Sequence, residues 1–145
     1  MDVDAFSLFI KSGVVVRNSG RDGKVEELKA TGDTLPVLRP AVLLVNHRTG
    51  SVAEMFAAAL QEYHAAYVLG ETTDGCVGYT DVGGLGDGSS LAVTTDVNTG
   101  PVTDKPLNGL GVIPAQAVAR SDADIAAGRD PQLDAAVVHL RSVAP

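Results

Sequence analysis

The sequence predicts an α/β fold with a mixed sheet, and two observations carry this prediction. Ala41–Val45 and Tyr67–Leu69 are short apolar runs, and Val52–Tyr63 between them has the apolar spacing of a helix. Strand, helix and strand within about 30 residues indicate a βαβ unit with parallel strands and a right-handed crossover. The stretch from Gly75 to Gly111 is rich in glycine and β-branched residues, which indicates further strands.

The N-terminal elements are short. Asp22-Gly23 is a strong hairpin-turn signal, so the segments on either side of it are expected to pair. The region is expected to form a helix over Asp4–Lys11 ending at Gly13, strands over Val14–Arg17 and Val25–Ala30, and a loop over Thr31–Pro40.

The central unit has the clearest pattern. Ala41–Val45 has no polar face, as expected of a strand buried on both sides of a sheet. Thr49-Gly50-Ser51 interrupts the chain before the helix. In that helix the apolar residues Met55, Phe56, Ala59 and Leu60 share one face, and Gly70 closes the strand that follows.

The C-terminal third is expected to contain a hairpin and a last helix. Strands over Val77–Val82 and Leu91–Thr95 are joined by Gly83–Ser90. That segment predicts a turn and not a phosphate loop, because no helix or lysine follows it and Asp87 would repel phosphate. Pro101–Pro106 is expected to be a loop. The helix spans Asp130–Leu140, with Pro131 in its first turn and Leu133, Val137 and Leu140 on one face.

Composition and charge limit the classes of function that this chain can have. The chain has 145 residues, which predicts one domain over 1–145, and it is 45% hydrophobic with a net charge of −7. This charge argues against binding to nucleic acid or an anionic membrane. No Lys or Arg occurs between Thr49 and Asp104. The acidic residues of that stretch are Glu54, Glu62, Glu71, Asp74, Asp81, Asp87, Asp96 and Asp104.

The sequence also argues against a disulfide, a signal peptide, a membrane span and a metal site. The single cysteine, Cys76, rules out an intrachain disulfide, and with no cation nearby in sequence it is expected to be a buried, inert thiol. The N-terminus has no signal-peptide pattern, and no run approaches the roughly 18 apolar residues of a membrane span. Neither the three histidines nor the aspartates have metal-ligand spacing, so no metal or cofactor is expected.

The sequence around Ser51 is compatible with two roles for this residue. Ser51-Val52-Ala53-Glu54 fits the capping box, in which the serine oxygen accepts from the Glu54 amide and the Glu54 carboxylate accepts from the Ser51 amide. Ser51 also lies between the end of a buried strand and a helix N-terminus, where ligand sites of α/β folds occur. An oxyanion formed beside it could be held by the Val52 amide.

The residues also carry a family resemblance. Val42–Gly75 (VLLVNHRTGSVAEMFAAALQEYHAAYVLGETTDG) resembles the C-terminal processing, or tail-specific, serine peptidases. The likeness continues in order through nearly the whole chain. Its other segments are SLFIKSGVVV, GRDGKVEELKATG, DGSSLAVTT, NGLGVIP and DPQLDAAVVHL. The resemblance implies a ClpP/crotonase-like peptidase core.

By this resemblance Ser51 is the nucleophile and the Val52 amide an oxyanion donor. The family uses a lysine as general base shortly after its Thr-x-Gly. Cys76 occupies that position here, and Thr80 replaces a supporting glutamine. Three interpretations stay open: a non-hydrolytic relative that binds peptide or nothing, another base such as His47 or His64, or a base missing because the chain is incomplete.

The resemblance also implies what surrounds this chain. It corresponds to the C-terminal half of a peptidase core, and the PDZ module and the first core half, with its Leu-Arg-x-Asn-x-Gly-Gly turn, are expected to be absent. The implied partners are peptides or protein C-termini, with self-association or a missing N-terminal half as further expectations. The family implies an extracytoplasmic location, which this chain alone does not decide. The predicted function is a serine-type peptidase, and the alternative is a catalytically inactive peptide-binding or interaction module.

Overall fold

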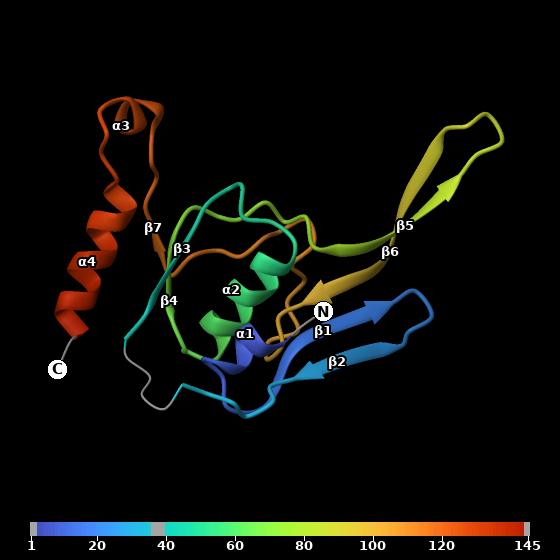
Figure 1. The fold of residues 1–145 in the computed structure, drawn as a ribbon, viewed down its shortest axis with the longest axis horizontal. Helices are drawn as coiled ribbons and strands as arrows, with labels where there is room; N and C mark the ends of the chain where they lie inside the picture. Colours follow the sequence, from blue (N-terminus) through green and yellow to red (C-terminus); the bar gives the residue numbers. More distant parts are fainter. Residues whose placement is uncertain (1–2, 36–39, 144–145) are drawn as a thin grey trace.

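The computed structural model describes residues 3–35 and 40–143 and has the expected α/β class. Residues 36–39 of the expected Thr31–Pro40 loop lie outside the described part. The elements follow the order α1 (Asp4–Ser7), β1 (Val14–Gly20), β2 (Val25–Lys29), β3 (Val42–Val45), α2 (Val52–Glu62), β4 (Tyr67–Gly70), β5 (Gly78–Gly84), β6 (Ser90–Thr99), β7 (Gln116–Ala117), α3 (Asp122–Ala126) and α4 (Pro131–Val143) (Figure 1).

The predicted βαβ unit is confirmed. β3 and β4 pair in parallel with Val42 opposite Tyr67 and Val45 opposite Gly70, and α2 connects them. Only glycine fits at position 70, because its φ is 136° and a Cβ would lie 1.9 Å from the Val45 carbonyl oxygen. β7, which the sequence pattern does not reveal, extends this sheet by pairing in parallel with β4.

The antiparallel strands form a second sheet of their own, in the order β2-β1-β6-β5. Asp22-Gly23 joins β1 to β2 and Leu85–Ser89 joins β5 to β6, so both predicted hairpins are confirmed. Parallel and antiparallel pairings are therefore separated into two sheets, and β6 connects the two hairpins by pairing with β1.

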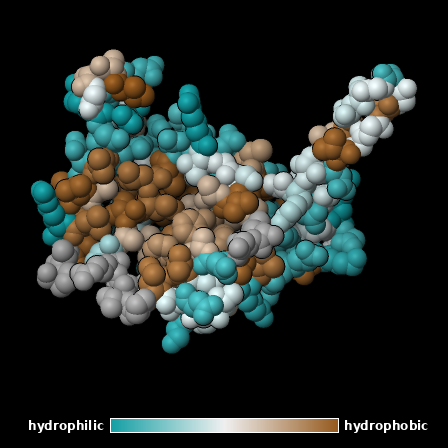
Figure 2. Space-filling view, viewed as in Figure 1, coloured by the Kyte–Doolittle hydropathy of each residue, from teal (hydrophilic) through white to brown (hydrophobic). Residues whose placement is uncertain are grey.

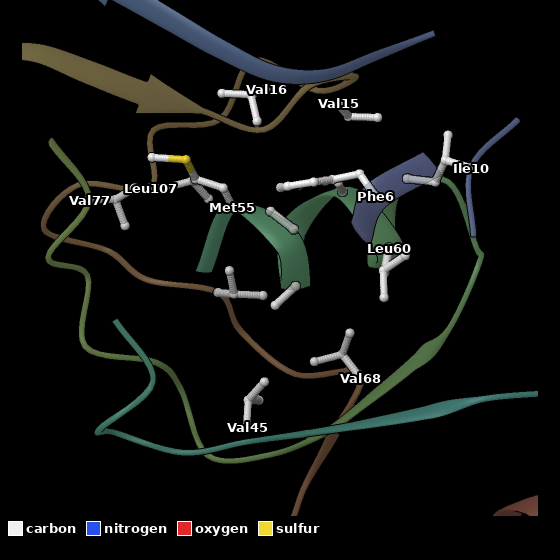
Figure 3. Packing of buried hydrophobic residues seen from close by; sticks show 14 residues of the cluster. Phe6, Ile10, Val15, Val16, Val45, Met55, Leu60, Val68, Val77 and Leu107 are labelled. Carbon is white, nitrogen blue, oxygen red and sulfur yellow. The ribbon is translucent and has the colours of Figure 1, made fainter. Parts of the chain in front are cut away.

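The core lies between the two sheets around α2 (Figure 3). Met55 faces Val77 and Leu107 at one end of the helix, and Leu60 lies near Phe6 and Ile10 at the other. The remaining walls come from Val15 and Val16 on β1, Val45 on β3 and Val68 on β4. The predicted apolar face of α2 is confirmed, since Met55, Ala59 and Leu60 are buried and Phe56 is half-buried.

Two burial expectations are wrong. β3 is not enclosed on both sides, because Leu44 keeps 39% of its surface exposed. α4 forms as expected, but Leu133 and Val137 are exposed. The helix packs on β3 and β4 through a different face, made of the small Ala136, of His139 stacked on Tyr67 at 3.8 Å, and of Gln132, which donates to the Val118 carbonyl at 2.8 Å.

The β5–β6 hairpin projects from the body of the molecule (Figure 1). Every residue of β5 is exposed, including Val82 at 69%. In the described part of the chain, no helix has the length and apolar character that crossing a bilayer requires.

Candidate functional site

Ser51 has an unusual backbone conformation. It lies at the start of α2, after the turn that leaves β3, with φ 58° and ψ −131°. L residues rarely adopt this region, and holding one there costs about 1–3 kcal/mol. Such strain persists only where surrounding contacts impose it, and it is concentrated at functional sites.

A second serine in the same motif serves as a comparison. Ser121 precedes α3 in Ser-x-x-Asp and has the ordinary cap conformation, φ −76° and ψ 161°. Its hydroxyl accepts from the Asp124 amide at 3.2 Å, as a helix cap should. At Ser51 the capping-box arrangement with Glu54 is also present, but the Glu54 amide donates to the Ser51 backbone carbonyl at 2.9 Å and makes no cap hydrogen bond to the hydroxyl of the kind formed at Ser121. Ser51 is exposed.

The strain at Ser51 predicts a stability gain on replacement. Ser51→Gly is expected to raise the free energy of unfolding by about 1 kcal/mol, because the relief of strain exceeds the entropy that glycine adds to the unfolded chain. Urea unfolding measures this change. The matched control is Ser121→Gly, whose backbone is relaxed and whose stability should fall by a few tenths of a kcal/mol. A loss of stability in Ser51→Gly would contradict the strain.

The Ser51 amide is held from two sides. It donates to the carbonyl oxygen of Cys76 at 3.1 Å and to the Glu54 carboxylate, also at 3.1 Å. The second bond is the carboxylate half of the predicted capping box. The first brings the backbone of Cys76 directly against Ser51, although 25 residues separate them in sequence.

Glu54 has a larger role than its motif suggests. Its side chain is fully buried, and one carboxylate oxygen accepts from the Gly75 amide at 2.7 Å and from the Thr73 hydroxyl. The Thr73 oxygen accepts in turn from the Val112 amide at 2.7 Å. One carboxylate thus connects the start of α2 to the 73–76 loop, and the loop to residue 112. The capping box identifies Glu54, but no local signal identifies its partners about 20 residues away.

A pocket of about 160 Å³ opens beside Ser51. Its lining residues are Ser51, Val52, Met55, Gly78, Tyr79 and Thr80. The Val52 amide belongs to the first turn of α2, where N–H groups have no intrahelical acceptor, and none of the described residues accepts from it. The pocket thus combines a hydroxyl with a helix N-terminus that favours negative charge.

The expectation of a buried Cys76 is wrong, because its thiol is exposed. Burial alternates along this loop: Thr73, Gly75 and Val77 point inward, and Asp74 and Cys76 point outward. The thiol lies on the outer surface beside Ser51, at the position that the family resemblance assigns to the general base.

The two histidines considered as bases are placed differently. His47 contacts the Glu71 carboxylate at 3.3 Å, and its ring is 69% exposed. His64 lies beyond the other end of α2, a helix about 16 Å long, and lines a separate pocket of about 250 Å³ with Tyr67 and His139. Within the described residues, no group of three or more His, Cys, Asp or Glu side chains could hold a metal ion.

The model of peptidase family S41 matches residues 1–118. A carboxyl-terminal-processing protease of Synechocystis sp. is 32% identical over 138 residues, 93% of this chain and 32% of the relative. Carboxyl-terminal-processing peptidase 1 of Arabidopsis thaliana is 30% identical over 77% of this chain and 23% of its own length. The chain spans about a third or less of these relatives.

Solved structures of peptidases also resemble this chain. A photosystem II D1 C-terminal processing protease matches with TM-score 0.70 and 29% identity, over 79% of this chain and 30% of that one. A peptidase from Parabacteroides merdae matches with TM-score 0.79 at 23% identity, over 92% of this chain and 45% of that one, which shows a shared fold.

Proposed function

Because the chain belongs to peptidase family S41, we propose that Ser51 is the nucleophile of a serine-type peptidase site. The observation that carries the proposal is the contrast between the two capping motifs: Ser121 has the relaxed backbone of a helix cap, whereas Ser51 has a strained backbone and lies beside a pocket. The names of the relatives suggest polypeptide C-termini as substrates.

In this proposal the Ser51 oxygen attacks the carbonyl carbon of a peptide bond. The carbonyl oxygen becomes negative and is held by the Val52 amide at the N-terminus of α2, where one such donor contributes about 3–4 kcal/mol. The C–N bond then breaks, the amine leaves with a proton, and water hydrolyses the ester. A base must accept the hydroxyl proton at the first step and return it to the amine.

Cys76 makes that proton transfer the slow step. A thiol accepts a proton only as the thiolate, and no Lys or Arg that would favour a thiolate occurs between Thr49 and Asp104. We therefore expect weak acylation of Ser51 by the protein as it stands. The same observation supports the second candidate function, a module that binds extended peptide in the Ser51 pocket without cleaving it.

Labelling with a fluorophosphonate probe tests the proposal. We expect slow, time-dependent labelling of the wild-type protein and none of Ser51→Ala, because the probe reacts with an activated serine. Ser121→Ala is the matched control, since it removes a serine from the same motif and should label like wild type.

The outcomes separate the two candidates. Labelling that persists in Ser51→Ala would exclude Ser51 as the nucleophile. A folded wild-type protein that never labels, yet binds peptide, would support the binding module over the peptidase.

A further inference from the structure

The β5–β6 hairpin, here called the arm (Gly78–Thr99), presents an open sheet edge beside the site. β5 is the last strand of its sheet, and all of its residues are exposed. It begins inside the Ser51 pocket, which Gly78, Tyr79 and Thr80 line. An unpaired edge strand is a template for another extended chain, because its outward N–H and C=O groups lack partners. A segment paired with β5 would pass directly by Ser51.

The side chains of β5 indicate what kind of segment fits. Asp81 and Val82 are neighbours on one strand and so point to opposite faces of the sheet. Val82 is 69% exposed and lies opposite Ala92, whereas Leu91 lies opposite Gly83 and therefore on the face of Asp81. In Figure 2 brown apolar patches stand out on an arm of mostly intermediate hydropathy. One face of a strand added to the edge of β5 would meet Val82, and the other face would meet the Asp81 carboxylate.

The charge of the arm has one sign. It contains Asp81, Asp87 and Asp96 and no Lys, Arg or His. A hydrogen bond from the Ser89 side chain lowers the pKa of Asp87, which keeps that carboxylate ionised at neutral pH. Asp74 adds a further carboxylate next to Gly50, the residue before Ser51. A segment that pairs with β5 therefore meets negative charge along the arm and near Gly50.

A second copy of this chain is a poor occupant of the edge. Asp81 is the central residue of Gly78–Gly84, so a two-fold antiparallel pairing that uses the whole of β5 would place Asp81 opposite Asp81. Like charges directly opposite each other on paired strands are destabilising. The net charge of −7 adds a general repulsion between copies.

We propose that the outer edge of β5 binds an extended polypeptide segment that alternates basic and apolar side chains, and that this pairing carries the segment past Ser51. The part concerning Ser51 rests on the proposed function, whereas the binding does not. Backbone pairing supplies the orientation, Val82 contacts the apolar side chains, and the carboxylates of the arm select lysine and arginine.

The test measures binding in the Ser51→Ala protein, so that cleavage does not intervene. The probes are the fluorescein-labelled octapeptide KVKVKVKV, its counterpart EVEVEVEV, and KVKVKVKV methylated on alternate backbone nitrogens. Fluorescence anisotropy should give about tenfold tighter binding of KVKVKVKV than of EVEVEVEV, because each exposed ion pair changes affinity by up to about fivefold. The preference should shrink between about 0.05 and 0.5 M salt.

Matched variants locate the binding. Asp81→Lys should weaken KVKVKVKV binding by about fivefold or more, whereas Asp122→Lys, an equal charge change on exposed α3, should have little effect. Equal effects of the two variants would overturn the proposal, as would equal binding of EVEVEVEV or of the methylated peptide. Binding without probe labelling of wild type would refute the peptidase and support the edge site, and labelling without binding would do the reverse.

Analytical ultracentrifugation tests whether a second copy of this chain occupies the edge of β5. We expect a monomer at the concentrations used for binding. A wild-type dimer that Val82→Lys dissociates would place a second copy of this chain on the edge and overturn the proposal.

Discussion

Replacing Cys76 with lysine is expected to accelerate fluorophosphonate labelling of Ser51 by about 10²-fold at alkaline pH. The Cys76 carbonyl accepts from the Ser51 amide at 3.1 Å, so a lysine side chain at this position is within reach of the Ser51 hydroxyl. General-base catalysis contributes about 10²–10⁴-fold, and the low end applies because position 76 is exposed. A solvated lysine near Asp74 keeps its proton, so the labelling rate should keep rising with pH toward the ordinary lysine pKa of about 10.4.

Two controls identify the cause of that acceleration. Cys76→Arg places a similar positive charge at the same position, but arginine does not lose its proton and cannot act as a base. Cys76→Met tests the loss of the thiol alone. Both variants should label no faster than wild type. If Cys76→Arg labels as fast as Cys76→Lys, the acceleration comes from the positive charge and not from a base. If Cys76→Lys labels no faster than wild type, a side chain at position 76 does not act as a base for Ser51.

Local patterns predicted the central unit well. The apolar runs around β3 and β4, the spacing within α2 and the Asp22-Gly23 turn each depend on nearby residues, and the structure confirms them. Ser51 was placed correctly at the start of α2 for the same reason. Its positive φ was not predicted, because the same four-residue motif at Ser121 has a relaxed backbone.

The errors arose where distant residues decide burial. The periodicity of α4 suggested packing through Leu133 and Val137, but contact with β3 and β4 favours the side of the helix with the small Ala136 and the polar Gln132. Cys76 was expected inside because no cation lies near it in sequence. Its exposure follows from alternation in the 73–77 loop, which is set by the inward residues Thr73, Gly75 and Val77. β7 is too short for any local pattern.

Glu54→Ala is expected to lower the free energy of unfolding by about 3–5 kcal/mol. The change leaves the Gly75 amide and the Thr73 hydroxyl without their acceptor in the interior, and each unsatisfied buried donor costs about 1–3 kcal/mol. The Ser51 amide keeps the Cys76 carbonyl and loses only one of its two partners. For a domain stabilised by about 5–15 kcal/mol, this is a large fraction of the total.

Urea unfolding of two further variants shows whether this loss of stability comes from the buried hydrogen bonds of Glu54 with Gly75 and Thr73. Glu54→Gln keeps the shape and one accepting oxygen, so it should lose only about 1–2 kcal/mol. Glu71→Ala removes a carboxylate whose contact partner, the His47 ring, is exposed, and should lose less than about 1 kcal/mol. Similar losses in all three variants would contradict the network. Because Glu54 also holds the amide of Ser51, Glu54→Gln should slow probe labelling even where the protein remains folded, whereas Glu71→Ala should leave that rate unchanged.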